Sequence, residues 1–243
     1  MTKVNLLNVA VIGANGFVGS QICKVLETSQ KFNLVRIVRG DDINSLVDEF
    51  DIAIHAANPA GRFIAESNPQ NDFIETVEKT SNILRAINGK PLLLLSTLSC
   101  KTQMDTNYGR NRRACELLTL SQGGCVVRLG PMFGGGRKKD TLHDLLAGRE
   151  VYVAPETRYA YVDVSWAASK IVEMLSSPSG VYEIGANNAV LLSDLRDYFN
   201  SKSVFSGIND TQIPEYCEGA PDARLVFSYA EKELINMHHS NDE

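Results

Sequence analysis

The first half of the chain alternates between short aliphatic runs and longer segments whose apolar residues recur every three or four positions. The runs predict strands at 8–12, 33–38, 52–55, 92–97 and 125–129. The amphipathic segments predict helices at 17–29, 69–87 and 108–120. The strand at 92–97 is almost entirely apolar, as are strands buried on both faces of a parallel sheet. Strands that alternate with helices predict right-handed βαβ units and a doubly wound α/β fold.

The composition of the chain changes at three consecutive glycines, which are followed by three basic residues at 137–139. We interpret this segment as a loop that leaves the sheet. Beyond it we expect helices at 141–147, 166–176 and 193–199, and short strands around 151–153 and 182–184. The resulting organisation is a dinucleotide-binding domain over 1–135, with part of 150–185 returning to it, and a small discontinuous substrate-side subdomain over 136–243.

A glycine-rich turn lies between the first predicted strand and the first predicted helix. Gly13 permits the tight turn, Gly16 lets the backbone approach a pyrophosphate, and Gly19 lets the helix pack closely on the strand. The N-terminus of the helix supplies N–H groups for the phosphates. The motif therefore predicts a Rossmann-like domain that binds a dinucleotide, with Asn15, Phe17 and Val18 completing the turn.

The end of the second predicted strand indicates which dinucleotide is bound. An acidic residue there would accept the ribose 2′-hydroxyl of NAD, but this strand ends at Arg39. A guanidinium suits a 2′-phosphate, which favours NADP and leaves NAD possible. In the alternative interpretation Arg39 is a solvated strand end, and Asp41 or Asp42 binds the ribose.

The overall composition excludes several classes of protein. The 243 residues are 44% hydrophobic, which is enough for a sizeable core. A net charge of −5 argues against bulk electrostatic binding to nucleic acid or to an anionic membrane. No apolar run reaches the roughly 20 residues of a membrane span, and we interpret the N-terminus as a strand and not as a signal peptide.

The cysteines and histidines argue against disulfide and metal chemistry. The five cysteines are odd in number, far apart and never in CxxC spacing, which fits a reducing cytoplasm. The four histidines form no metal-ligand pattern with neighbouring Cys, Asp or Glu residues. We therefore expect no metal site.

Several motifs together resemble the extended short-chain dehydrogenase/reductases, the NAD(P)-dependent epimerase/dehydratase family that acts on sugar nucleotides. The glycines at 13, 16 and 19 have that family's spacing, and Asp51–Ala57 resembles its D-x-V-I-H-x-A strand. Val77, Thr80, Asn82 and Leu84 match part of its N-V-x-G-T-x-N-L-L helix. Tyr108–Glu116 is similar to its Y-G-x-S-K-x-x-x-E helix. Further matches are Leu94–Thr97, Arg128, Phe133 and Gly134, Arg158, and Tyr161–Val164.

The resemblance assigns roles to individual residues. It implies that Asp42 and Ile43 contact the adenine, and that His55, Ala56 and Ala57 pass beside the cofactor. It implies a homodimer formed through the helices at 69–87 and 108–120. It also implies a catalytic set of Thr97, Tyr108 and Arg112.

Tyr108 and Arg112 are four residues apart on one predicted helix, so their side chains share a face. A tyrosine with an ordinary pKa of about 10 moves a proton near neutrality only if positive charge lowers that pKa. In the family, a lysine at the position of Arg112 lowers the pKa of the tyrosine and holds the nicotinamide ribose. Arg112 keeps the charge but is larger and planar. The alternative is a helix-surface tyrosine in a protein that binds NADP without turning it over.

Other departures from the family pattern concern the substrate side. Only ten residues separate Thr97 from Tyr108, and few residues separate the second strand from Asp42, which implies a trimmed α/β layer. The residues that we expect to reach substrate are Arg62, Ser99, Phe133, Arg137, Arg158 and Arg224.

The leading hypothesis is a cytoplasmic NADP-dependent oxidoreductase that reduces a keto group of a nucleotide-linked deoxysugar. An epimerase or dehydratase that reduces and reoxidises its own bound NAD(P) is the second hypothesis. A non-catalytic NADP-sensing regulator is the third, because Arg112 and the shortened loop permit it.

Overall fold

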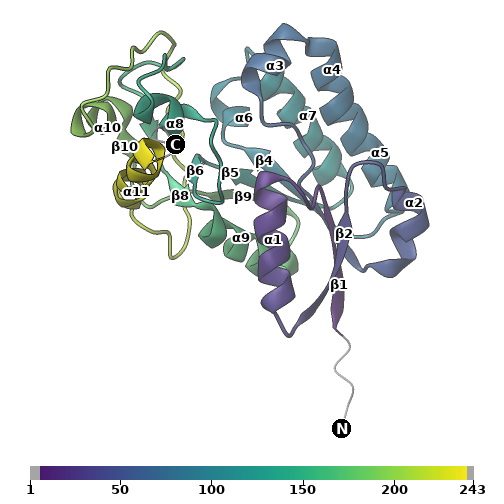
Figure 1. Ribbon diagram of the computed structural model, residues 1–243. Helices are drawn as coiled ribbons and strands as arrows, with labels where there is room; N and C mark the ends of the chain where they lie inside the picture. Colours follow the sequence, from purple (N-terminus) through teal and green to yellow (C-terminus); the bar gives the residue numbers. More distant parts are fainter. Residues whose placement is uncertain (1–5, 240–243) are drawn as a thin grey trace. The chain divides into compact units, whose positions relative to one another are not determined.

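The structure, a computed structural model, describes residues 6–239 (Figure 1). This part of the chain divides into two compact units. The first contains the described residues up to Leu129 together with Ala168–Tyr182, and the second contains Gly130–Ala167 and the described residues from Glu183 onward. Helix α9 (Val164–Glu173) and strand β9 (Gly180–Ile184) each have residues in both units.

The first unit is built on a sheet whose strands follow the order β2-β1-β3-β4-β5-β9. The strands from β2 to β5 pair in parallel, with Ile12 opposite both Ile37 and His55. The order reverses between β1 and β3, and doubly wound sheets bind ligands outside the carboxyl ends of the strands at such a point. The predicted doubly wound α/β fold is confirmed, with strands at Leu7–Ile12, Phe32–Ile37, Ile52–His55, Leu92–Thr97 and Cys125–Leu129.

Helices cover both faces of this sheet (Figure 1). On one face α1 (Phe17–Thr28) packs on β1 and β2. On the other, α7 (Asn107–Ser121) packs on β4 and β5 and against a long helical run. That run consists of α4 (Pro69–Phe73), a π-helical turn at Ile74–Glu78 and α5 (Lys79–Ala86). Shorter helical segments are α2 (Ile43–Leu46), a 3₁₀ turn at Val47–Glu49, α3 (Arg62–Ser67), α6 (Ser99–Thr102) and a 3₁₀ turn at Met174–Ser176.

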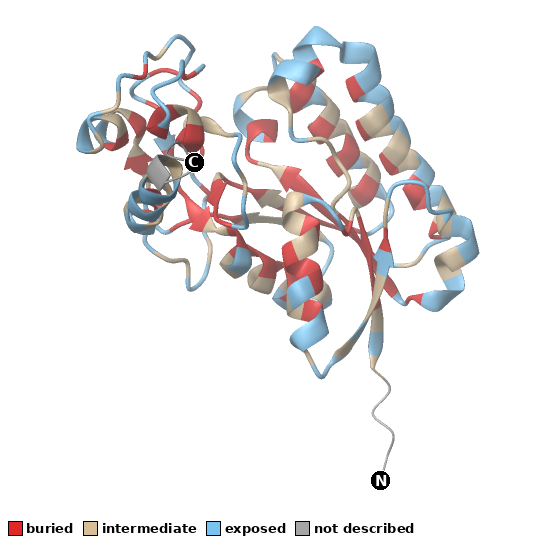
Figure 2. Ribbon diagram, viewed as in Figure 1, coloured by how far each residue is buried: buried red, intermediate tan, exposed pale blue. Residues whose placement is uncertain are grey.

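The core of the first unit lies between the sheet and these helices (Figure 2). Leu92–Leu95 of β4 are buried, as the unbroken apolar run predicted. One cluster joins Ile12 and Ile37 of neighbouring strands to Ile83 and Leu84 of α5. The apolar side chains face inward. A binding site is therefore expected at the carboxyl ends of the strands, where the turns carry polar residues.

The described part of the second unit contains two short strand pairs and, besides the first turn of α9, the helices α8 (Thr141–Leu146), α10 (Leu192–Tyr198) and α11 (Leu225–His239). β6 (Met132–Phe133) pairs in parallel with β8 (Val162–Asp163), and β7 (Arg158–Tyr159) pairs antiparallel with β10 (Val190–Leu191). Aromatic rings pack within this unit: Tyr159 and Tyr161 meet edge to face with centroids 5.5 Å apart.

Several predicted elements of secondary structure differ from the structure. The strand predicted around Val151–Val153 is wrong, because Val151 forms only a single bridge to Phe205. The sequence also gave no prediction for α3, α6 or α11, which are short or lack a clear amphipathic period. Within residues 6–239, no helix combines the length and the apolar character that a membrane span needs.

Candidate active site

The glycine turn after β1 packs tightly against the segment that follows β3. Gly13 has φ +90°, and a Cβ at this residue would lie 2.8 Å from the carbonyl oxygen of Ala56 and 2.9 Å from the Cα of Ala57. A Cβ on Gly19 would lie 2.2 Å from the Gly13 carbonyl oxygen. Side chains at either position would therefore push the turn away from its neighbours. Gly16 is the N-cap of α1 and provides no side-chain cap, so the first turn of the helix presents backbone N–H groups to an incoming anion.

The tip of β2 presents Arg39 at the surface. Its side chain is 90% exposed, and its guanidinium lies 3.5 Å from a carboxylate oxygen of Glu75. Asp41 accepts a hydrogen bond from the Val38 N–H, and Asp42 caps α2 by accepting one from the Asn44 N–H. Both carboxylates therefore have local structural partners. An open pocket of about 350 Å³ lies here, lined by Asp41, Ile43, Asn44, Glu75 and Lys79 among others.

Helix α7 carries Tyr108 and Arg112 on one face, as their spacing predicted. The helix begins after Thr106, whose hydroxyl accepts a hydrogen bond from the Gly109 N–H. Gly109 also allows close packing, because a Cβ there would lie 2.0 Å from the Gln103 carbonyl oxygen. Glu66 of α3 accepts a hydrogen bond from the Tyr108 N–H, which places a carboxylate at the positive end of the helix dipole.

The guanidinium of Arg112 lies over the ring of Tyr108, with its Cζ 4.2 Å from the ring centroid. Its Nη1 donates to Asp72, 3.2 Å from each carboxylate oxygen, and to the Thr76 hydroxyl at 3.0 Å. Its Nη2 donates to the Pro59 carbonyl. The Arg112 side chain is only 3% exposed. Arg112 thus keeps positive charge beside the phenol while most of its donors are held by protein groups.

Ser99 joins Thr97 to Arg62, and the Arg62 guanidinium lies beside the Tyr108 ring. The Thr97 hydroxyl lies 3.3 Å from both the Ser99 hydroxyl and the Ser99 N–H. Arg62 donates to the Ser99 hydroxyl at 3.1 Å, and its Cζ lies 6.0 Å from the Tyr108 centroid. The structure therefore brings together five residues that the sequence singled out, Arg62, Thr97, Ser99, Tyr108 and Arg112.

His55 is fully buried beneath this group. Its Nδ1 accepts from the Ala57 N–H, so Nε2 carries the proton and donates to Thr80, whose hydroxyl donates to Cys115. Burial, together with the positive charges of Lys79 and Arg112, lowers the pKa of His55 to about 3. The neutral ring fixes the backbone of Ala57, which in turn contacts the glycine turn.

Comparisons with known proteins test the fold of the chain. No protein-family profile matches the chain. Over 139 residues it is 31% identical to a UDP-2-acetamido-2,6-beta-L-arabino-hexul-4-ose reductase of Pseudomonas aeruginosa, and the match covers 53% of this chain and only 36% of that relative.

Similar solved structures cover nearly the whole chain. A UDP-N-acetylglucosamine 4-epimerase from Methanobrevibacter ruminantium, in complex with UDP-N-acetylmuramic acid, has a TM-score of 0.78 at 14% identity and covers 97% of this chain and 99% of its own. RMD from Pseudomonas aeruginosa, complexed with NADPH, has a TM-score of 0.72 at 18% identity and covers 93% and 99%. The fold is that of the short-chain dehydrogenase/reductases. The resemblance predicted from the sequence is confirmed.

The connection between β2 and β3 is short, as the sequence predicted from the family pattern. It holds only α2 and one 3₁₀ turn. The strand that resembles the family's D-x-V-I-H-x-A motif is β3, the third strand along the chain. Glu116, which matches the last residue of the family's tyrosine helix, is buried and accepts from Ser96, Arg113 and Arg128. These hydrogen bonds outweigh burial and lower its pKa, so Glu116 joins α7 to β4 and β5 as a carboxylate.

A short-chain dehydrogenase/reductase fold implies a nicotinamide dinucleotide, and the residues present fit one. The turn from Gly13 to Gly19 packs backbone against backbone at Gly13 and Gly19, and the helix that follows it has no side-chain cap at Gly16. Beside it, both side-chain amide atoms of Asn58 are buried and have no hydrogen-bond partner in the described part of the chain. Uncapped backbone N–H groups and an unsatisfied amide are features that a bound polar ligand would complete.

Sequence reasoning missed four residues of this site. Asp72 and Thr76 hold Arg112, Glu66 caps α7, and Asn58 follows the matched strand motif. One signal was available: Asp72 and Thr76 are four residues apart on a predicted helix, so they share a face. That this face meets Arg112 depends on the packing of two helices and could not be inferred from periodicity.

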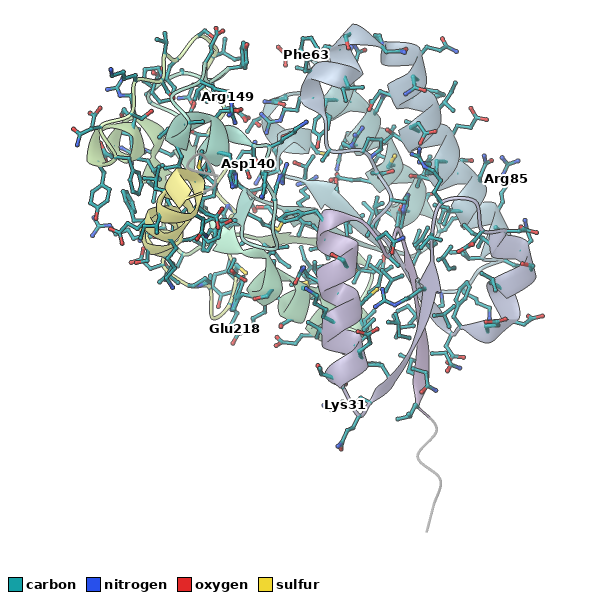
Figure 3. The ribbon with its side chains drawn as sticks, in the orientation of Figure 1. Lys31, Phe63, Arg85, Asp140, Arg149 and Glu218 are labelled. Carbon is teal, nitrogen blue, oxygen red and sulfur yellow. The ribbon has the colours of Figure 1, made fainter. Side chains whose placement is uncertain are left out.

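The remaining substrate-side residues belong to the second unit. Phe133 is buried, with its ring centroid 5.1 Å from that of Tyr229. Arg158 and Arg224 are exposed. Arg137 lies 3.5 Å from Asp140, which is labelled in Figure 3 and also lies 2.7 Å from His143 Nδ1. Burial raises the pKa of the nearby Tyr161 well above 10, so this phenol stays protonated. Within the described residues, no cluster of His, Cys, Asp or Glu could hold a metal ion.

Proposed function

We propose that this chain is an NADP-dependent oxidoreductase that reduces a keto group of a nucleotide-linked deoxysugar. The observation that carries the proposal is the position of Tyr108, whose ring lies under the Arg112 guanidinium and beside Arg62, with Thr97 and Ser99 adjacent. The similarity to a UDP-sugar keto reductase supports the reaction class. The similarity of fold to a protein solved with NADPH supports the cofactor class.

The residues of the site suit proton delivery to a carbonyl oxygen. Bound NADPH would supply the hydride to the carbonyl carbon. Tyr108 gives its phenolic proton to the carbonyl oxygen, and Thr97 donates a hydrogen bond to the same atom. The Arg112 guanidinium, which lies over the Tyr108 ring, orients the ring for this transfer. Proton and hydride together convert the ketone to an alcohol.

The proposed preference for NADP rests on Arg39. Its exposed guanidinium can reach a 2′-phosphate, and its ion pair with Glu75 is long and solvated, so it costs little to break. Asp41 and Asp42 are already engaged by backbone N–H groups. That engagement makes a ribose contact of the NAD type less favourable than a contact between Arg39 and phosphate.

We propose substrate-binding residues in each unit separately. In the first unit, Arg62 and Ser99 can bind polar groups of the sugar beside the reacting carbonyl. In the second unit, we assign Arg137, Arg158, Arg224 and Phe133 to the nucleotide diphosphate and the base. This assignment keeps 1–135 as the cofactor domain and 136–243 as the substrate side.

Incubation with NADPH and a panel of 4-keto sugar nucleotides tests the proposal. We expect net oxidation of NADPH and formation of one new alcohol. Inversion of a sugar carbon without net redox change, together with co-purifying NAD(P), would instead indicate the epimerase or dehydratase. Binding of NADPH with no turnover across the panel would leave the NADP-sensing regulator.

We also propose that the protein is a cytoplasmic homodimer. Apolar side chains on α4, the π-helical turn and α7 are exposed, among them Phe73, Ile74 and Leu117. A helical face of this kind is suited to a second copy. The thiols of all five cysteines are free, as in a reducing compartment. Light scattering should give twice the monomer mass, and Leu117→Glu should reduce it to that of one chain.

A further inference from the structure

Asn58 occupies a short segment that connects the two halves of the candidate site. The preceding residue, Ala57, abuts the glycine turn, where a Cβ on Gly13 would lie 2.9 Å from its Cα. The following residue, Pro59, accepts a hydrogen bond from Arg112. Asn58 is therefore one residue from the expected pyrophosphate position on one side and one residue from the Tyr108–Arg112 pair on the other.

The side chain of Asn58 is unsatisfied in a way that is rare inside proteins. Its amide nitrogen and its amide oxygen are both buried, and neither has a hydrogen-bond partner within residues 6–239. A primary amide offers two donors and an acceptor, and most buried groups of this kind are hydrogen-bonded. A ligand that both donates and accepts hydrogen bonds would satisfy the nitrogen and the oxygen of this amide.

Arg112 is poorly placed to supply that interaction itself. In the family that this chain resembles, a lysine at this position holds the nicotinamide ribose. Here both hydrogens of Arg112 Nη1 are directed at Asp72 and Thr76, and Nη2 donates to Pro59. A buried guanidinium with these partners would have to break a buried ion pair before it could bind a ribose hydroxyl.

We propose that the Asn58 amide binds the nicotinamide half of the dinucleotide, in place of the contact that the family's lysine makes. The inference rests on the proposed function, since it requires a dinucleotide in this site. A dinucleotide whose pyrophosphate lies on the glycine turn and whose ring reaches Tyr108 must pass its nicotinamide ribose along residues 57–59. Ribose hydroxyls and the nicotinamide carboxamide both donate and accept, which matches the two unsatisfied ends of Asn58.

The substitution Asn58→Leu tests whether the Asn58 amide binds the cofactor or stabilises the fold. Leucine replaces both unpaired polar atoms by apolar ones of similar size, so the melting temperature of the ligand-free protein should stay the same or rise. The affinity for NADPH should fall about tenfold, because one buried hydrogen-bonding group is lost from the complex. A melting temperature lowered by the substitution would show that the amide has a structural partner, and would overturn the proposal.

Adenosine 2′,5′-bisphosphate identifies which half of the cofactor is bound, because it lacks the nicotinamide and its ribose. Calorimetric titration of the wild type and Asn58→Leu should show weaker binding of NADPH and unchanged binding of the bisphosphate. Asn33→Ala, an exposed amide at the start of β2, serves as the control and should change neither. Asn58→Ala provides a second variant with less bulk and the same expected pattern.

Three outcomes would count against the proposal. Unchanged NADPH affinity in both Asn58 variants, or equal losses for NADPH and the bisphosphate, would overturn this inference and leave the proposed function standing. Failure of the wild type to bind any dinucleotide would overturn the proposed function and this inference together.

Discussion

The Cζ of Arg112 lies 4.2 Å from the centroid of the Tyr108 ring, and its Nη1 is held by the carboxylate of Asp72 at 3.2 Å. This relationship differs from a lone cation beside a phenol, because Asp72 balances part of the charge. The guanidinium lies close enough to the ring for a cation–π contact, and its hydrogen bonds to Asp72, Thr76 and Pro59 fix its direction. Arg112 is therefore both an electrostatic partner of Tyr108 and a structural link between α7 and α4.

Asp72→Ala should destabilise the protein strongly. It leaves the Arg112 charge buried without its partner, which costs about 3–5 kcal/mol in comparable cases. Urea denaturation measures the free energy of unfolding. Glu27→Ala breaks the exposed Arg36–Glu27 pair and should cost no more than about 1 kcal/mol. Similar losses in the two variants would contradict the structural role of the Asp72–Arg112 pair.

The sequence predicted the part of the site that depends on short-range pattern. Gly13, Gly16 and Gly19 were found because strand, turn and helix follow one another directly, and Tyr108 and Arg112 because four residues complete one helical turn. Asp72 and Asn58 were missed because their importance depends on which elements meet in space. Val151–Val153 was assigned wrongly because its alternating pattern has no partner strand, only one bridge to Phe205.

Substitutions in the glycine turn should follow the space available at each position. Gly19→Ala brings a Cβ to 2.2 Å from the Gly13 carbonyl oxygen and should abolish dinucleotide binding by displacing the turn. Gly16→Ala brings one to 3.1 Å from the same oxygen and should weaken binding less. Titration of NADPH against both variants measures the difference. Stronger binding in Gly19→Ala than in Gly16→Ala would count against the proposed position of the turn.

Arg39→Ala should lower selectivity for NADP. Loss of a charged contact to the 2′-phosphate should weaken NADPH binding about tenfold and leave NADH binding unchanged. Arg36→Ala removes an exposed arginine of β2, three residues before Arg39, and is the matched control. Equal effects of Arg39→Ala on both cofactors, or a loss of NADH binding in Asp42→Asn with none in Arg39→Ala, would favour NAD.

His55 should make the protein less stable in mild acid. Its pKa is 6.5 in an unfolded chain and about 3 in the native core, so below pH 6.5 the unfolded state binds a proton that the native state does not. Stability is therefore lost as the pH falls from 6.5 towards 3, by about 2 kcal/mol at pH 5. Urea denaturation at pH 7 and pH 5 should show a smaller difference for His55→Gln than for the wild type. The same pH dependence in both proteins would mean that His55 is protonated in the native state.

The rate of NADPH oxidation by Tyr108→Phe, with the keto sugar nucleotide that the wild type reduces, tests the central claim most directly. Removal of the phenolic hydroxyl should lower kcat by at least about a hundredfold, while NADPH affinity stays close to that of the wild type. The control is Tyr182→Phe. The Tyr182 hydroxyl donates to the Pro178 carbonyl, also in the first unit, and its removal should leave full activity. A Tyr108→Phe enzyme that retains most of the wild-type kcat would contradict the claim that Tyr108 delivers the proton.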